Sequence, residues 1–211
     1  MLKKYSVLSG IIISISLLLI ATTLYPGGSE FDKTSIGYSW KTNYISNLFG
    51  EKAINGADNG GRFWAIAGML FLSASFAVIF IKFSKKIPVK SAANVIKYTG
   101  VISMIFTFLI ATPLHDLMVS LSSTIFLIGL FYVTVFIYKS RLHFLKFICS
   151  ICLLVFYSTL YIYGFGQFLE FLPIMQKITF VVTITTIISL EYFTRKEDFL
   201  NAKSDNNVLE M

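Results

Sequence analysis

The chain has 211 residues, of which 55% are hydrophobic and 14% are charged, and its formal net charge is +7. An ordinary soluble domain carries about 25% charged residues, so this composition excludes that class. The basic excess does not indicate a nucleic-acid-binding protein, because 13 of the 18 Lys and Arg residues gather in four clusters that alternate with long apolar segments.

Six apolar segments predict membrane-spanning helices. A helix crosses the hydrocarbon core with about 20 residues, and five segments of 17 or more residues contain no charge, while the sixth holds only Lys177 near its start. We therefore predict an all-α integral membrane protein, a six-transmembrane-helix bundle that forms one domain over residues 1–195. The expected spans are 5–25, 62–82, 97–113, 114–138, 146–166 and 172–192, followed by a polar cytoplasmic tail over 196–211.

The basic clusters also predict the orientation of the bundle. They lie at residues 3–4, 82–97, 139–146 and 195–203, at alternate ends of the six segments. Cytoplasmic loops carry an excess of Lys and Arg, so these ends and both termini are expected in the cytoplasm. The opposite ends hold five basic residues against six acidic ones.

The first apolar segment has two interpretations, a cleaved secretory signal or a retained helix. Its apolar run is longer than a usual signal core, and residues 24–26, Leu-Tyr-Pro, are a poor cleavage site. We interpret it as a retained helix. Ser6, Gly10 and Ser14 recur every four residues, a stripe that lets a neighbouring helix approach closely.

A long extracytoplasmic connection follows over residues 26–61, and such a connection rarely lacks structure of its own. Within it, Asn43, Ser46 and Asn47 share one helical face, and apolar residues at 44–45 and 48–49 cover the rest. This spacing predicts a short amphipathic helix over residues 43–50, between the first two spans. It is expected to lie at the interface or to dip into the bundle.

A polar hinge at residues 112–123 separates the third and fourth spans. Thr112 and Pro113 suit the N-cap and the first position of the fourth helix. His115, one of two histidines in the chain, precedes Asp116. Asp116 falls in the first turn, where the helix dipole favours a carboxylate, and serines four and seven residues later continue an inward polar stripe.

The sixth span begins with polar residues. Gln176 opens an inward stripe that three threonines continue. Lys177 has two interpretations: its ammonium reaches back to the interface, or it pairs across the bundle with Asp116 or Glu170.

No cofactor or metal is expected. The sequence contains no P-loop, no GxGxxG segment and no HExxH. Cys149 and Cys152 form a CxxC on an apolar helix without a further ligand nearby, and we interpret them as small buried side chains. Two histidines are too few for the three-histidine zinc sites of ceramidase-like and adiponectin-receptor-like membrane hydrolases.

The segment TNYISNLFG and the apolar helix after it resemble a prokaryotic membrane family known as domain of unknown function 998 (DUF998). The family's "N-x-I-S-x-L-G" segment, helix glycine and helix-start histidine correspond here to Asn43, Ile45, Ser46, Leu48, Gly50, Gly68 and His115, with Phe49 inserted before Gly50. The segment IMQKITF resembles the family's "Q-R-I" turn, with Lys177 in place of Arg. The resemblance covers about residues 5–195. It implies a multi-pass fold in a prokaryotic plasma membrane and almost no biochemistry.

Three classes of function stay open. The favoured one is binding of a membrane lipid, or of a membrane-protein partner, through the extracytoplasmic polar residues. The second is a lipid hydrolase-like enzyme that uses His115 or Asp116 as acid or base, and the third is a small transporter, although no charged residue is expected at the midplane. The candidate ligand-binding residues are Asn43, Ser46, Asn47, Arg62, His115, Asp116, Gln176 and Lys177. The oligomeric state is left open.

Overall fold

The structure, a computed structural model, describes residues 2–203 and the side chains of residues 5–200. Six helices within this part are long and apolar enough to cross a membrane, so the predicted six-helix bundle of a multi-pass membrane protein is confirmed. The helices are α1 (Leu2–Thr23), α2 (Arg62–Ser84), α3 (Lys90–Leu109), α4 (His115–Tyr138), α5 (His143–Phe165) and α6 (Leu172–Phe193), and three short 3₁₀ helices are η1 (Ile45–Phe49), η2 (Leu169–Phe171) and η3 (Lys196–Lys203).

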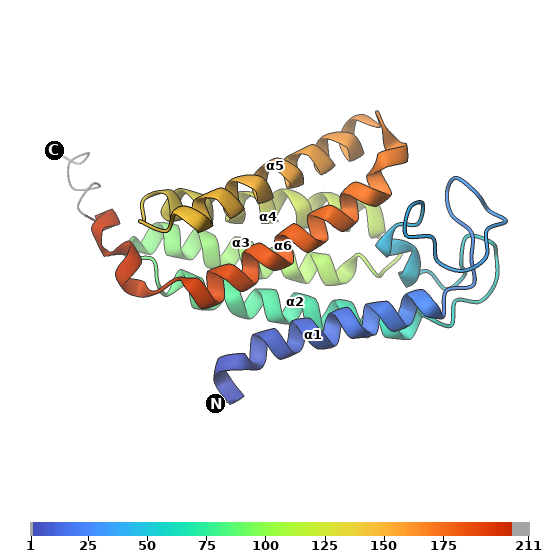
Figure 1. The fold of residues 1–211 in the computed structure, drawn as a ribbon, viewed down its shortest axis with the longest axis horizontal. Helices are drawn as coiled ribbons and strands as arrows, with labels where there is room; N and C mark the ends of the chain where they lie inside the picture. The colour runs from blue at the N-terminus through green and yellow to red at the C-terminus, as the bar shows by residue number, and fades with distance from the viewer. Residues whose placement is uncertain (1, 204–211) are drawn as a thin grey trace.

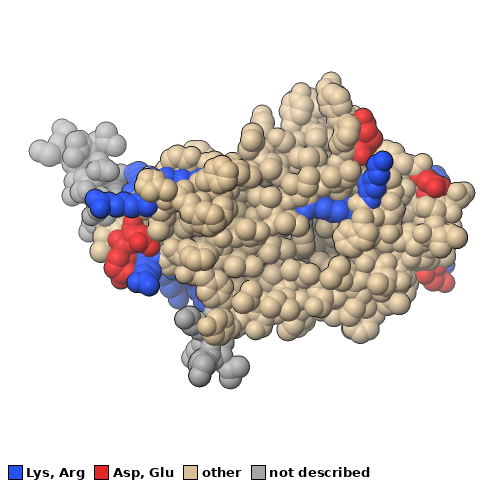
Figure 2. All heavy atoms as spheres, in the orientation of Figure 1, with Lys and Arg blue, Asp and Glu red and all other residues tan. Residues whose placement is uncertain are grey.

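The helices run up and down between two ends of an elongated bundle (Figure 1). Helix α1 begins at the end where the last described residues lie, and the long connection between α1 and α2 lies at the other end. Helices α1 to α4 pack against one another in chain order, and the α5–α6 hairpin packs against α4 and α2. On the face shown in Figure 2, charged side chains gather toward the two ends, and a broad band free of charge separates them.

The outer surface of this band explains why so many apolar side chains are exposed. Phe165, Phe147 and Val181 each expose more than half of their surface. In water such a surface would drive aggregation, but in hydrocarbon it has no cost. The exposed apolar side chains therefore face lipid.

Small residues allow the close contact between α1 and α2 that the stripe in the first helix predicts. A methyl group placed on Gly10 would lie 2.3 Å from the hydroxyl of Ser75, and one on Gly68 would lie 3.1 Å from the carbonyl of Ser14. Helix α3 approaches α2 in the same way, because a methyl group on Gly100 would collide with the Phe80 ring.

The connection between α1 and α2 is folded into a compact cap by asparagine side chains. Asn43 is fully buried. Its side-chain NH₂ group donates to the carbonyl of Gly28 at 2.6 Å, and its side-chain oxygen accepts from the main-chain amide of Ser39. Asn59 donates to the carbonyls of Leu48 and Gly50. These bonds satisfy main-chain groups that a buried loop would otherwise leave unpaired.

The predicted amphipathic helix is present as η1, a 3₁₀ helix that begins at Ile45 rather than at residue 43. Leu48 and Phe49 are buried, and η1 packs on α2 and α6. The side chain of Asn47 accepts from the amide of Tyr44 at 2.7 Å and so closes the first turn. The segment therefore dips into the bundle instead of floating at the interface.

The predicted N-cap of the fourth helix is wrong. Helix α4 begins at His115 with Leu114 as its N-cap. The Thr112 hydroxyl instead donates to the carbonyl of Leu109 at 2.7 Å and accepts from the amide of Leu114. It therefore stabilises the end of α3 and the turn that follows, where the carbonyl of Leu109 also accepts from the main-chain amide of Thr112 at 3.0 Å.

Helical structure extends beyond the predicted spans, most clearly before the third span and in the tail. Helix α3 starts at Lys90, well before residue 97, because its first turns can keep their lysines in water while Ala92 and Ile96 are buried. The expected polar tail begins as η3, in which Phe199 is buried against Phe83. The remainder of the tail, residues 204–211, lies outside the described residues.

Candidate functional site

A cavity of about 960 Å³ lies inside the half of the bundle next to the cap. Its walls come from η1 and from helices α2 to α6. The size is at the upper end of the range usual for ligand sites, about 300–1,000 Å³. The cavity is therefore large enough to hold a ligand, and we treat it as the candidate functional site.

One end of the cavity is polar, and most of the predicted site residues meet there. We call this end the polar rim; its members are Ser46, Asn47, Glu51, Arg62, His115, Asp116 and Gln176. Six of the eight candidate ligand-binding residues are in this set. The other two, Asn43 and Lys177, do not line the cavity.

Asn43 and Lys177 instead hold the cap on the bundle. The Lys177 ammonium donates to the carbonyl of Asn43 at 2.5 Å and to the carbonyl of Pro173 at 3.0 Å, and it lies 5.6 Å from the centre of the Tyr38 ring. The adjacent Gln176 accepts from the amide of Ile45 at 2.7 Å through its side-chain oxygen. The predicted ion pair of Lys177 with Asp116 or Glu170 is not found among the described residues, because main-chain oxygens of the cap and of α6 accept from its ammonium.

His115 and Asp116 form a pair at the start of α4. The Nδ1 atom of His115 lies 2.9 Å from Oδ1 of Asp116, whose side chain is 88% exposed. In the neutral imidazole that uses this carboxylate as its acceptor, Nδ1 carries the proton and Nε2 keeps its lone pair. Nε2 is buried and has no hydrogen-bond partner among the described residues. The free nitrogen is therefore available to a bound molecule.

Two basic side chains among the described residues line the cavity, those of Lys52 and Arg62, and each forms an ion pair with an acidic side chain. Arg62 donates to Glu51 at 2.8 Å and to the carbonyl of Phe49 at 3.1 Å, and Lys52 forms an ion pair with Asp58. Both pairs are largely exposed to solvent. The rim thus holds charges but presents no unpaired Arg or Lys.

Tyr44 adds a hydroxyl beside the rim. Burial raises the pKa of Tyr44, and the nearby carboxylate of Glu30 raises it further. The hydroxyl therefore stays protonated at neutral pH and can donate. Both residues line the cavity.

The other end of the cavity is apolar, and we call it the apolar floor. Its members are Met69, Leu72, Phe76, Met104, Phe126 and Phe156. Phe76 lies 14 residues after Arg62 in α2, which is about 21 Å along the helix axis. The cavity therefore reaches about halfway through a bilayer, which measures about 40–45 Å with its headgroup regions.

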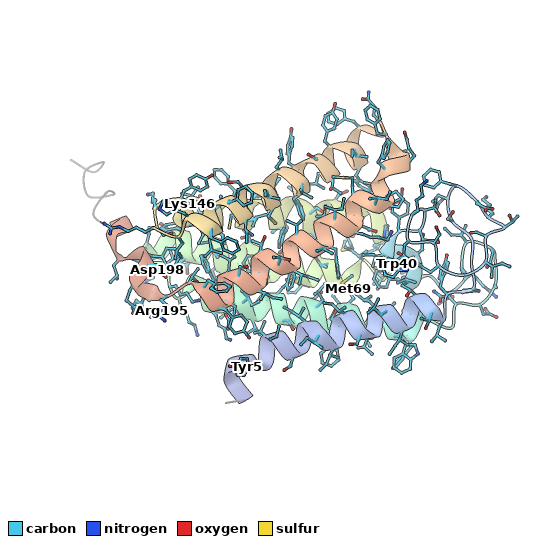
Figure 3. The ribbon with its side chains drawn as sticks, in the orientation of Figure 1. Tyr5, Trp40, Met69, Lys146, Arg195 and Asp198 are labelled. Atoms are coloured by element: carbon cyan, nitrogen blue, oxygen red, sulfur yellow. The ribbon has the colours of Figure 1, made fainter. Side chains whose placement is uncertain are left out.

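The apolar floor is the part of the site that the sequence did not reveal. Its residues look like any others on the inner faces of apolar helices. Figure 3 marks Met69 within the bundle and Trp40 near the cap. Of the three threonines predicted to continue an inward stripe on the sixth span, Thr179 and Thr183 line the cavity and Thr186 does not; Thr159 of α5, which was not predicted, lines it as well.

The cavity exists because α5 is packed closely at only one end. Its buried residues, Leu145, Cys149 and Cys152, all lie in its first half, as expected for the two cysteines. There Tyr138 of α4 and Ser150 share a hydrogen bond of 2.6 Å. At the other end, a methyl group on Gly164 would meet open space. Helix α5 therefore leaves room beside α4 in the half of the bundle next to the cap.

Comparison with models of protein families, with curated proteins and with solved structures finds no match.

Proposed function

We propose that the protein binds a membrane amphiphile, with the polar headgroup at the polar rim and the hydrocarbon chain along the apolar floor. One observation carries this proposal: a single cavity has hydrogen-bonding side chains at the membrane surface and apolar side chains deep in the bundle. A lipid has the same division of polarity along its length. The proposed depth of the chain, about one leaflet, also agrees with that of a membrane lipid.

The proposed setting is a prokaryotic plasma membrane with both termini in the cytoplasm. The basic residues near the ends of α2, α4 and α6 support this orientation. Figure 3 shows Lys146, Arg195 and Asp198 at the end of the bundle where α1 begins. Membership of the DUF998 family stays a proposal that depends on the motifs in the cap and at His115.

Filling the cavity tests the binding proposal. Val119 lines the cavity from α4, whereas Leu117 on the same helix is exposed on the outer surface. We expect Val119→Trp to lower the amount of lipid that copurifies with the protein at least about tenfold, the equivalent of ~1.4 kcal/mol. Leu117→Trp is the matched control and should retain lipid.

Native mass spectrometry of the protein released from detergent measures this difference. Equal amounts of bound lipid in the wild type and both variants would contradict the proposal. A melting temperature for Val119→Trp close to that of Leu117→Trp is required, so that loss of lipid is not loss of fold.

A second candidate function is hydrolysis of the bound lipid ester. The observation that favours it is the His115–Asp116 pair with Nε2 unpartnered and buried. In this mechanism Nε2 takes a proton from water as the water oxygen attacks the ester carbonyl. The proton then passes to the leaving alcohol, so that one ester and one water give one acid and one alcohol. Release of fatty acid from monooleoylglycerol by the wild type, and its loss in His115→Phe, would support this function.

A further inference from the structure

The polar rim is poorly suited to a phosphate group. Phosphate is bound by unpaired Arg or Lys side chains or by free amides at a helix N-terminus. Here Arg62 is bonded to Glu51 and to a main-chain carbonyl, and Lys52 is paired with Asp58. Lys177, the nearest cation on α6, donates to the cap and does not line the cavity.

The acidic residues of the cavity make a phosphate group at the polar rim still less favourable. Glu30, Glu51 and Asp116 all line it. Asp116 also lies in the first turn of α4, where it occupies the positive end of the helix dipole that would otherwise attract an anion. A phosphate at the rim would therefore meet carboxylates without gaining a cation.

The groups at the cavity wall that are free to bind are mostly neutral. The hydroxyls of Ser46 and Ser123 line the cavity, and no hydrogen bond to another described residue is found for either. The side-chain oxygen of Gln176 is used by Ile45, which leaves its NH₂ group as a donor. His115 offers the lone pair of Nε2, which needs a donor from the ligand.

We infer that the polar rim selects an uncharged headgroup that carries hydroxyls, such as the glycerol of a monoacylglycerol or a sugar, over a phosphate. A hydroxyl can donate to Nε2 of His115 and accept from Ser46 or Gln176 at the same time. A phosphate dianion has no proton to donate, so it leaves Nε2 unsatisfied. The inference rests on the proposed binding of an amphiphile and specifies its headgroup.

A comparison of three oleoyl-chain amphiphiles tests it. Monooleoylglycerol, oleoyl lysophosphatidic acid and oleylamine share the chain and differ in the headgroup: neutral, phosphate or ammonium. Delipidated wild-type protein is titrated with each, and the bound fraction is measured by native mass spectrometry. We expect monooleoylglycerol to bind at least about tenfold more tightly than lysophosphatidic acid.

Two outcomes overturn the inference while the proposed function stands: equal or tighter binding of lysophosphatidic acid, or tightest binding of oleylamine. Failure of all three amphiphiles to bind contradicts the proposed function itself. The two failures are therefore distinct in one experiment.

A histidine variant tests the named contact. His115→Phe removes the Nε2 acceptor and should weaken monooleoylglycerol roughly fivefold, the effect of one hydrogen bond, with little change for oleyl phosphate, which carries a phosphate and no free hydroxyl. His143→Phe, at the exposed start of α5 near the other end of the bundle, is the matched control. Equal weakening of both amphiphiles by His115→Phe would show that the residue only shapes the cavity, and would overturn the assigned contact.

Discussion

The ammonium of Lys177 in α6 donates to the main-chain carbonyl of Asn43 in the cap, across 134 positions of the sequence. Gln176, the preceding residue, accepts from the amide of Ile45. Two neighbouring side chains of one helix therefore hold both ends of the turn that leads into η1. This attachment fixes the roof of the cavity.

Loss of the lysine should loosen the roof. Lys177→Met removes a hydrogen bond from a charged donor, so we expect the free energy of unfolding to fall by about 1.5–3 kcal/mol. Thermal unfolding in detergent measures the change. Lys41→Met, an exposed lysine in the same cap, is the control and should leave the melting temperature nearly unchanged.

Asp116 and Lys177 should act independently. The described partners of Asp116 are His115 and, through its carbonyl, Ser120 on α4, and Tyr163 on α5, whereas Lys177 bonds to the cap. The free-energy changes of Asp116→Asn and Lys177→Gln should therefore add within about 0.5 kcal/mol in the double variant. A larger interaction term would indicate one coupled network at the rim.

The inner face of η1 should be essential for folding. Leu48 is 1% exposed in the cap, whereas Ile36 in the same connection is 97% exposed. Leu48→Asp buries an unpaired carboxylate and should cost several kcal/mol, about 3–5, while Ile36→Asp should cost less than about 0.5 kcal/mol. Equal melting temperatures for the two variants would mean that η1 does not pack on the bundle.

The orientation of the bundle can be tested with single cysteines. Thr34 is exposed in the connection between α1 and α2 and Ser91 is exposed at the start of α3, whereas Ser29 is fully buried and would not react. In intact cells an impermeant maleimide should label Thr34→Cys and spare Ser91→Cys. The native cysteines are buried, so the wild type is the unlabelled control. Labelling of both variants would contradict the topology.

Lys86 should make stability depend on alkaline pH. It follows α2 and donates to carbonyls at the end of α6, including that of Thr194 at 3.0 Å. Burial lowers the pKa of Lys86 below its usual 10.5. In the window just below pH 10.5 the unfolded state then binds more protons than the native state, so stability should rise with pH there. Lys86→Met should remove that rise in thermal unfolding curves, and an unchanged slope would exclude Lys86 as its source.

Local chemistry in the sequence was enough to predict the number of spans, the short helix in the first connection and the group of polar residues near the membrane surface. Each of these predictions depends on a short-range pattern: segments without charge, alternating basic clusters, and the spacing of Asn43, Ser46 and Leu48. Six of the eight proposed ligand-binding residues could be brought to one end of the bundle on that basis.

The cavity and the true partners of Lys177 were decided by the tertiary structure. Whether Phe126 and Phe156 fill a core or line a space depends on the divergence of α5 from α4, and no property of either residue encodes that separation. Lys177 could be assigned acids or headgroups from the sequence, since both attract an ammonium. In the folded protein the carbonyl of Asn43 in the cap accepts from the Lys177 ammonium. A partly buried cation donates to whichever acceptor lies within reach, and only the packing of the chain determines which acceptor that is.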